Sequence, residues 1–239
     1  MPTCKLSVNI NKIALIRNSR GNNYPDLVQV AKDCESFGAD GITVHPRPDQ
    51  RHVRFDDIAL LKQVVQTELN IEGNPTPSFL KLVLDNCPAQ CTLVPDADHA
   101  LTSDSGWDCI KHHDFLKDIC QMLQEKNIRV SIFLNPEPKQ FEALATIGTD
   151  RIELYTGNYA KYFYENSAKA VKPFHLCSML ARDMKIGLNA GHDLNLNNLK
   201  YFYQNTVDLL EVSIGHALVV DSIYSGLKTT INQYKNCLL

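Results

Sequence analysis

The strongest constraint on the fold is a regular alternation of short apolar, strand-like runs with longer helix-like segments along the chain. Strands are expected at residues 6–10, 41–44, 69–72, 91–94, 128–134, 151–155, 185–189 and 209–213. Helices are expected at residues 25–37, 55–67, 77–85, 109–126, 138–147, 159–165, 173–183, 196–204 and 217–234. Strict alternation of this kind predicts parallel strands that are joined by helices.

Eight such units fit within 239 residues, and no low-complexity linker divides them. We therefore expect one α/β domain over residues 1–239, a single (β/α)8 TIM barrel with extra helices between the sixth and seventh strands. The competing architecture is a doubly wound open sheet. That fold normally carries a glycine-rich G-x-G-x-x-G turn after its first strand, and this sequence has none there.

Composition excludes several classes of function. A net charge of −3 gives no electrostatic footprint for nucleic acid or an anionic membrane. No run approaches about 18 consecutive apolar residues, and residues 1–5 lack the pattern of a signal peptide, so we expect a cytoplasmic protein. Cys87 and Cys91, the closest of eight cysteines, have no second Cys or His pair at zinc-finger spacing. We expect reduced, mostly buried thiols and no metal site.

The most informative stretch, GITVHPRPDQRH, covers residues 41–52. After its strand come His45, Arg47, Arg51 and His52, so groups that exchange protons near neutral pH lie beside groups that bind phosphate or carboxylate. The prolines at positions 46 and 48 stiffen the loop. By itself this stretch also fits a solvated basic loop.

Polar groups collect at the same end of other expected strands, where (β/α)8 barrels carry their active sites. Every expected strand except the fifth contributes at least one, and the set comprises Asn9, Asn11, Lys12, His45, Arg47, His52, Glu72, Thr102, Ser103, Glu153, Asn189, His192, Ser213 and His216. Glu72 with His45 and His192 suits stepwise proton transfer. The turns Gly191-His192 and Gly215-His216 each lead into an expected helix, which is the usual phosphate position in these barrels.

Together these motifs resemble those of the pyridoxine 5′-phosphate synthase family, the ring-closing enzymes of vitamin B6 biosynthesis. The resemblance runs from about residue 6 to residue 227. Its motifs are VNI at 8–10, RNSRG at 17–21, YPD at 24–26, GADGITVHPRPDQRH at 38–52, NIE at 70–72, LVP at 93–95 with LT at 101–102, IE at 152–153 with TG at 156–157, LNAGH at 188–192 and IGHA at 214–217.

The resemblance implies a (β/α)8 barrel and a transferase that condenses 1-deoxy-D-xylulose 5-phosphate with 3-amino-2-oxopropyl phosphate. It implies no metal or organic cofactor. It also implies a homo-oligomer, in which dimers build an octamer as a tetramer of dimers, with Arg20 reaching a neighbouring active site.

The residue roles that the resemblance implies are catalytic and substrate-binding. Glu72 would be the principal general base, His45 an acid–base group in imine formation, His192 a proton donor near phosphate elimination and Glu153 a stabiliser of a charged intermediate. Substrate-binding positions would be Asn9, Asn11, Lys12, Arg20, Arg47, His52, Thr102, Asp193, Gly215 and His216.

The chain departs from the family pattern in three places. Asn11-Lys12 replaces the usual Asp-His, so a carboxylate is lost and a fixed cation is gained near the sugar phosphate. Asp193 replaces the usual glycine, and we expect it to cap the next helix. Pro46 and Pro48 replace less restrictive residues, which stiffens the loop.

Two alternatives remain open from the residues. Another phosphosugar barrel, such as an aldolase or epimerase, is one, although a Schiff-base aldolase would need a lysine within a strand and only Lys185 comes close, at the wrong rim. A barrel that binds a phosphorylated ligand without turnover is the other. That reading predicts loss of Glu72, His45 or His192, and all three are present.

Overall fold

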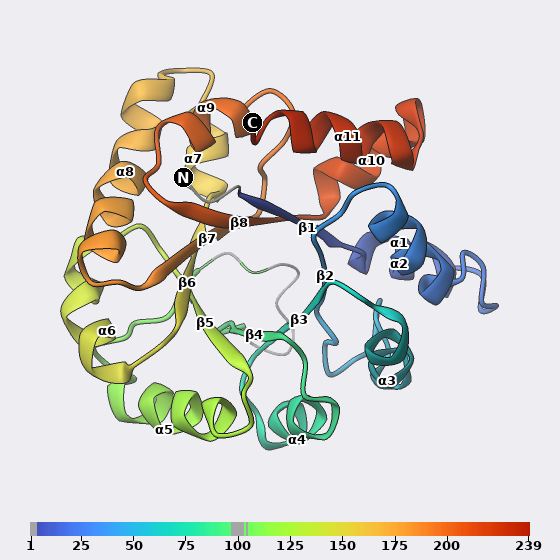
Figure 1. The fold of residues 1–239 in the computed structure, drawn as a ribbon, viewed down its shortest axis with the longest axis horizontal. Coiled ribbons are helices and arrows are strands. Elements are labelled where there is room, and N and C mark those ends of the chain that lie inside the picture. The colour runs from blue at the N-terminus through green and yellow to red at the C-terminus, as the bar shows by residue number, and fades with distance from the viewer. Residues whose placement is uncertain (1–3, 97–102, 104) are drawn as a thin grey trace.

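The computed structural model describes residues 4–96, 103 and 105–239. Its eight strands form a closed barrel in sequence order, and each pairs in parallel with its neighbours, the eighth with the first. The strands are β1 (Lys5–Asn9), β2 (Gly41–Val44), β3 (Glu68–Gly73), β4 (Gln90–Leu93), β5 (Arg129–Leu134), β6 (Arg151–Tyr155), β7 (Gly187–Gly191) and β8 (Leu209–Ile214). Figure 1 shows the helices as an outer ring around this barrel, so the predicted fold is confirmed.

In the described part of the chain, the helices that surround the barrel outnumber its strands. They are α1 (Asn11–Asn18), α2 (Leu27–Ser36), α3 (Phe55–Val64), α4 (Pro77–Asn86), α5 (His113–Gln124), the 3-10 turn η1 (Pro138–Gln140), α6 (Phe141–Ile147), α7 (Gly157–Tyr162), α8 (Ser167–Asp183), α9 (Leu199–Gln204), α10 (His216–Ser225) and α11 (Leu227–Asn236). The extra helices α7 and α8 lie between β6 and β7, as the sequence predicted. No helix in the described part of the chain is long and apolar enough to cross a membrane.

Helix α1 was not predicted, because its buried face is short and contains a charge. The buried residues are Ile13, Ala14 and Arg17, and Arg17 occupies a position where periodicity analysis looks for an apolar side chain. Its guanidinium forms two hydrogen bonds to Asp57 of α3, at 2.7 and 2.8 Å. It also donates to the backbone oxygen of His52, so it fixes the loop after β2 to two helices.

Several other boundaries differ from the prediction, and three of the differences have a clear cause in the local structure. Helix α8 begins at Ser167, where the Asn166 side chain caps it, and continues through Pro173, which was expected to start it. The expected closing helix is two helices, because Gly226 has a φ of 77° and interrupts it. Strand β7 spans 187–191 rather than 185–189, since Lys185 adopts a φ of 58° in the preceding turn.

The barrel interior is unusually polar where it underlies the site. Ser7 and Thr43 share a hydrogen bond of 2.6 Å, the Asn70 amide lies 3.4 Å from Thr43, and Thr92 donates to Asn70 at 3.1 Å. Branched apolar residues fill these layers in most barrels of this type. Here the apolar core lies between the sheet and the helices, and the inner layers carry hydrogen-bonding groups up to the rim at the C-terminal ends of the strands.

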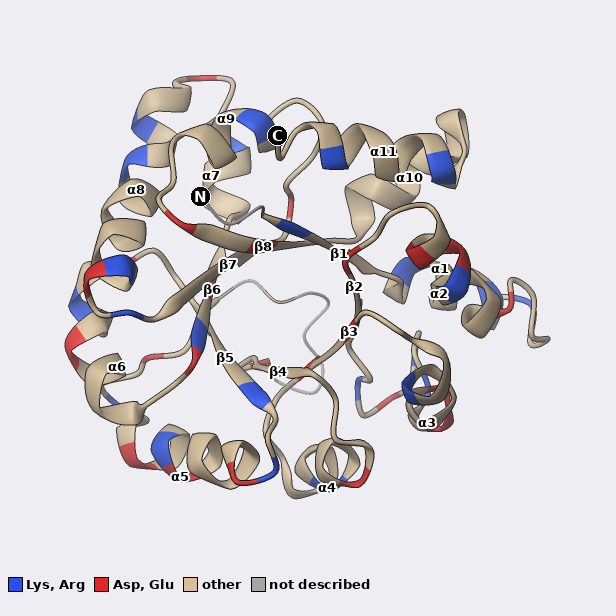
Figure 2. Cartoon of the chain, in the orientation of Figure 1, with Lys and Arg blue, Asp and Glu red and all other residues tan. Residues whose placement is uncertain are grey.

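The opposite rim, at the N-terminal ends of the strands, is closed by ion pairs. Arg129 pairs with Glu68, Arg151 donates to Glu211 at 3.2 Å, and the Gln90 amide also donates to Glu211 at 3.2 Å. Figure 2 shows charged residues on the strands as well as on the outer helices. Glu211 is buried, and a buried charge requires partners, which Arg151 and Gln90 supply.

Candidate active site

A cavity of about 510 Å³ opens at the C-terminal ends of the strands. Of the fourteen residues predicted to be catalytic or substrate-binding, eleven line it: Asn9, Asn11, Lys12, His45, Arg47, His52, Glu72, His192, Asp193, Gly215 and His216. A second cavity of about 470 Å³ opens beside α7 and α8, and none of the predicted residues lines that one.

The other three of these fourteen residues lie outside the cavity lining. Arg20 is exposed in the turn after α1, on the outside of the molecule. Glu153 is buried in β6. Thr102 lies outside the described residues.

The loop after β2 brings two buried imidazoles and a buried guanidinium to the cavity. The rings of His45 and His52 lie 6.4 Å apart, centroid to centroid. Burial lowers the pKa of both, and the charge of Arg47 lowers it further, to about 4 for His52. Both histidines are therefore neutral at pH 7, and each can accept a proton as a general base without first losing one.

Hydrogen bonds hold the loop that carries these imidazoles, and one of them fixes the His52 ring. The Val53 N–H donates to Nδ1 of His52 at 3.0 Å, so the neutral ring carries its proton on Nε2. The Asn18 amide donates to the backbone oxygen of His52 at 2.7 Å. The side-chain oxygen of Asn11 accepts the backbone N–H of His45 at 2.9 Å. Asn11, one of the departures from the family pattern, therefore supports the loop that carries His45.

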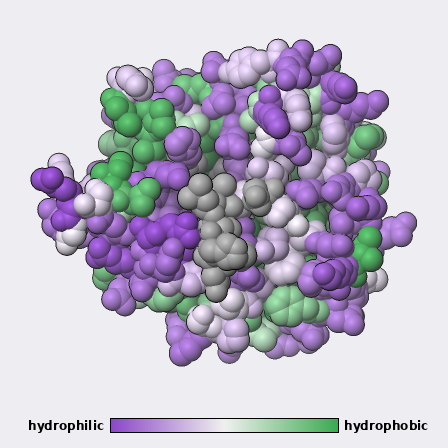
Figure 3. All heavy atoms as spheres, turned by 180° about the vertical axis from the view of Figure 1, so that it is seen from behind, coloured by the Kyte–Doolittle hydropathy of each residue, from purple (hydrophilic) through white to green (hydrophobic). Residues whose placement is uncertain are grey.

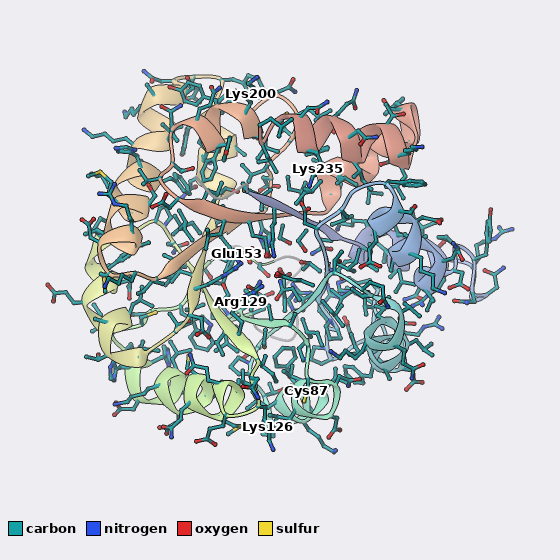
Figure 4. The ribbon with its side chains drawn as sticks, in the orientation of Figure 1. Cys87, Lys126, Arg129, Glu153, Lys200 and Lys235 are labelled. Atoms are coloured by element: carbon teal, nitrogen blue, oxygen red, sulfur yellow. The ribbon has the colours of Figure 1, made fainter. Side chains whose placement is uncertain are left out.

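Two buried carboxyl groups from β3 and β6 hold their protons unusually strongly. Glu72 is 4% exposed, and burial, then the charges of Asp96 and Glu211, raise its pKa above the ordinary value. Glu153 is 1% exposed, and burial, then Glu72, raises its pKa. Figure 4 shows Glu153 near the middle of the barrel. Carboxyl groups kept neutral by burial can donate or accept protons near neutral pH.

The turn after β7 holds His192 in a left-handed conformation, with a φ of 73°. Its ring contacts Phe133 and Tyr155, with centroid distances of 5.0 and 5.6 Å. The Thr156 hydroxyl donates to the backbone oxygen of Gly191 at 2.7 Å. A Cβ on Gly191 would lie 2.2 Å from Oε1 of Glu153, so a larger residue here would have to displace that carboxyl group.

Asp193 does not cap the next helix, so that prediction is wrong. Helix α9 begins only at Leu199, with Asn198 in the cap position. Asn198 instead donates its side-chain amide to the backbone oxygen of Asp193 at 3.2 Å. The turn at His192 therefore does not lead directly into a helix, whereas Gly215 immediately precedes α10 as predicted.

Sequence reasoning missed Asp96 as a site residue. Its carboxylate pairs with Arg47 at 2.7 Å and accepts the Ser103 hydroxyl at 2.5 Å. Asp96 lies three residues after the end of β4. The strand-end rule, by which polar residues at the C-terminal ends of the strands form the site, could therefore have found it as it found the other groups. Within the described ranges, no cluster of three or more His, Cys, Asp or Glu side chains could hold a metal ion.

A family model described as pyridoxal phosphate biosynthesis protein PdxJ matches residues 6–239. The pyridoxine 5′-phosphate synthase of Christiangramia forsetii is 53% identical over 234 residues, covering 98% of this chain and 99% of the relative. The enzyme of that name from Bacteroides fragilis is 54% identical over 234 residues with the same coverage, and the one from Cytophaga hutchinsonii is 53% identical over 230 residues, or 96% of this chain and 97% of the relative.

Solved structures with the same fold are far more distant in sequence. The 3-keto-L-gulonate-6-phosphate decarboxylase of Vibrio cholerae aligns with a TM-score of 0.67 at 10% identity and covers 99% of both chains. A 4-hydroxy-2-oxoglutarate aldolase/2-deydro-3-deoxyphosphogluconate aldolase from TTHB1 aligns with a TM-score of 0.65 at 13% identity and covers 98% of this chain and 94% of the other. At such identity the likeness establishes the barrel fold alone.

Proposed function

Because the chain belongs to the pyridoxal phosphate biosynthesis protein PdxJ family, we propose that its rim site catalyses the pyridoxine 5′-phosphate synthase reaction. The substrates are 1-deoxy-D-xylulose 5-phosphate and 3-amino-2-oxopropyl phosphate. The products are pyridoxine 5′-phosphate, inorganic phosphate and water. The reaction is a transferase-class condensation in which an imine forms, phosphate is eliminated and the ring closes.

The observation that carries this proposal is the meeting of Glu72, His45 and His192 in one cavity that also holds cationic and helix-end groups for phosphate. An imine formation, an elimination and an aromatising deprotonation need several proton carriers, and two phosphorylated substrates need two anion sites. A non-catalytic binder would need the anion sites but not the proton carriers.

Glu72 is the proposed general base. In the ligand-free protein, burial and the nearby carboxylates keep it protonated. The ammonium group of 3-amino-2-oxopropyl phosphate would bring a positive charge next to it, and an opposite charge favours the ionised carboxylate. The same argument applies to Glu153, which would balance positive charge on an intermediate. Substrate binding would therefore activate the base.

His45 and His192 are the proposed acid–base groups. Burial lowers the pKa of each, so the free protein holds them neutral at pH 7. A bound phosphate dianion would favour the imidazolium form of a nearby histidine. We propose that His45 transfers protons during imine formation and that His192, once protonated, donates a proton as phosphate leaves.

The two phosphates have separate proposed sites. Arg47 and His52, from the loop after β2, would bind the phosphate of the deoxyxylulose substrate, together with Lys12 and Thr102. Gly215 and His216, where α10 begins, would hold the amino-ketone phosphate or the product, together with Asn9. Backbone N–H groups at a helix start favour anions, which supports the second assignment.

Asn11, Asp193 and Arg20 have more indirect proposed roles. Asn11 would support His45, which explains how the site tolerates the loss of the usual carboxylate. Asp193 lines the cavity beside His192, where its charge raises the pKa of the imidazole and would favour the proton-donating form. Arg20 is exposed and would act at the active site of a neighbouring copy.

We propose a cytoplasmic homo-oligomer of dimers, up to an octamer. An apolar face supports this proposal: exposed side chains gather on α1 and α10, which are in contact, and they are Leu15, Ile16, Val220, Ile223 and Tyr224. Figure 3 shows hydrophobic residues gathered at the upper left of the face that it presents. Exposed apolar patches of this kind mark association surfaces. Sedimentation velocity of Ile223→Asp against the wild type tests the assembly.

The role of Glu72 is tested with Glu72→Gln. The variant should bind both substrates within a few-fold of the wild type and lose turnover by at least about 100-fold, because the amide cannot accept the proton. Glu125→Gln, at an exposed position after α5, is the matched control and should retain activity. Loss of substrate binding together with turnover would assign Glu72 a positioning role instead.

A further inference from the structure

Three loops of the catalytic rim meet at Asp96. Its Oδ2 lies 2.7 Å from Nη2 of Arg47, which follows β2, and 2.5 Å from the Ser103 hydroxyl, which follows β4. Its backbone oxygen accepts the side-chain amide of Asn74, which follows β3, at 2.8 Å. One residue therefore fastens the ends of three consecutive strands.

The pair of Asp96 and Arg47 is buried. The two side chains are 6% and 5% exposed. A buried charge needs a partner, and removing one member of such a pair leaves the other uncompensated. The guanidinium is planar and its donors have a fixed geometry, so a carboxylate bound to one amino group restricts where the other donors can point. Asp96 thereby constrains how Arg47 faces the cavity.

Asp96 also places a negative charge close to both Glu72 and His192. It is the largest charge effect on Glu72, ahead of Glu211, and both raise the pKa, while Arg47 lowers it. On His192 it acts with Asp193 to raise the pKa, again against Arg47. The general base and the proton donor therefore share one fixed electrostatic influence.

We propose that Asp96 is a positioning residue of the synthase site, which orients Arg47 for the substrate phosphate and sets the charge environment of Glu72 and His192. This inference rests on the proposed function for its kinetic consequences. Its structural consequences can be measured without turnover.

The decisive variant is Asp96→Asn, which keeps the size and an acceptor oxygen and removes the charge. Loss of a negative neighbour favours ionised Glu72 and neutral His192, so the pKa of each group falls. The acidic and the basic limb of the pH profile of turnover, which these two groups govern, should both move to lower pH. Inorganic phosphate should bind about tenfold more weakly, because the neutral amide holds the Arg47 guanidinium less firmly than the carboxylate does. A merely structural defect would lower activity without moving the limbs.

Two further variants provide controls. Asp96→Glu retains the charge, so Glu72 should titrate close to its wild-type pH while phosphate binding weakens. Asp49→Asn removes a carboxylate that is 49% exposed and pairs with Arg51 on the same loop. Because solvent screens that charge, the Glu72 titration should stay unchanged.

The measurement is a carbon-13 NMR titration of glutamate side chains, assigned with Glu72→Gln, together with calorimetry of inorganic phosphate binding. A lower titration midpoint for Glu72 and weaker phosphate binding in Asp96→Asn would support the inference. An unchanged midpoint with unchanged phosphate affinity would overturn it. Failure of the wild type to form the pyridoxine ring would overturn the proposed function, and these two readouts would still decide the role of Asp96.

Discussion

The buried pair of Arg17 and Asp57 gives the sharpest prediction about stability. The Arg17 side chain is 1% exposed and forms two hydrogen bonds to a carboxylate that is 13% exposed. Asp57→Asn would leave the guanidinium buried without a counter-charge. Removing one partner of a buried ion pair costs about 3–5 kcal/mol, so we expect the free energy of unfolding to fall by that amount.

Urea denaturation measures this loss. With a slope of about 2 kcal/mol per molar urea, the midpoint should fall by about 1.5–2.5 M while the slope stays constant. Arg17→Met should cost less, because the partly exposed carboxylate of Asp57 can be hydrated and still caps α3 through the Arg54 N–H. The double variant should cost less than the sum of the two. A loss below about 1 kcal/mol for Asp57→Asn would refute the reasoning, because the pair would then contribute no more than an exposed one.

Two other predictions follow from the site. Gly191→Ala should reduce turnover at least tenfold, because its methyl would displace Glu153 and roughly such a loss follows a small misplacement of a reacting group. The control is Gly187→Ala, which crowds Arg151 at the opposite rim and should retain most activity. Equal losses of turnover in the two variants would contradict the argument. The lowered pKa of His52, about 4, stabilises the fold above pH 6.5, and this stability is lost as the pH falls. Between pH 7 and 5 the loss should be about 2 kcal/mol for this residue, and denaturation curves of His52→Gln should show a weaker pH dependence.

Alternation of strands and helices was enough to predict the barrel, because strands joined by helices run parallel and eight such units have the size of a (β/α)8 barrel. The errors occurred where a polar group replaces an apolar one, or where one residue changes the backbone direction. Helix α1 was missed because Arg17 occupies its buried face. The break between α10 and α11 was missed because a single glycine, at position 226, creates it.

The strand-end rule predicted most of the cavity lining, because every parallel strand of a barrel delivers its C-terminal residues to one rim. It could not predict which groups pair with each other. The partnership of Asp96 with Arg47 joins residues 49 positions apart in the sequence, and it depends on the closed barrel. Burial, which keeps His45 neutral and Glu72 protonated, also arises only in the folded chain.

The most direct test of the account is turnover of both phosphorylated substrates by the purified protein, with EDTA added. We expect the pyridoxine ring to form with release of one inorganic phosphate for each ring, detected by absorbance and by a phosphate assay. Binding of 1-deoxy-D-xylulose 5-phosphate without ring formation would contradict the account, and would leave a barrel that binds phosphorylated ligands without performing the synthase reaction.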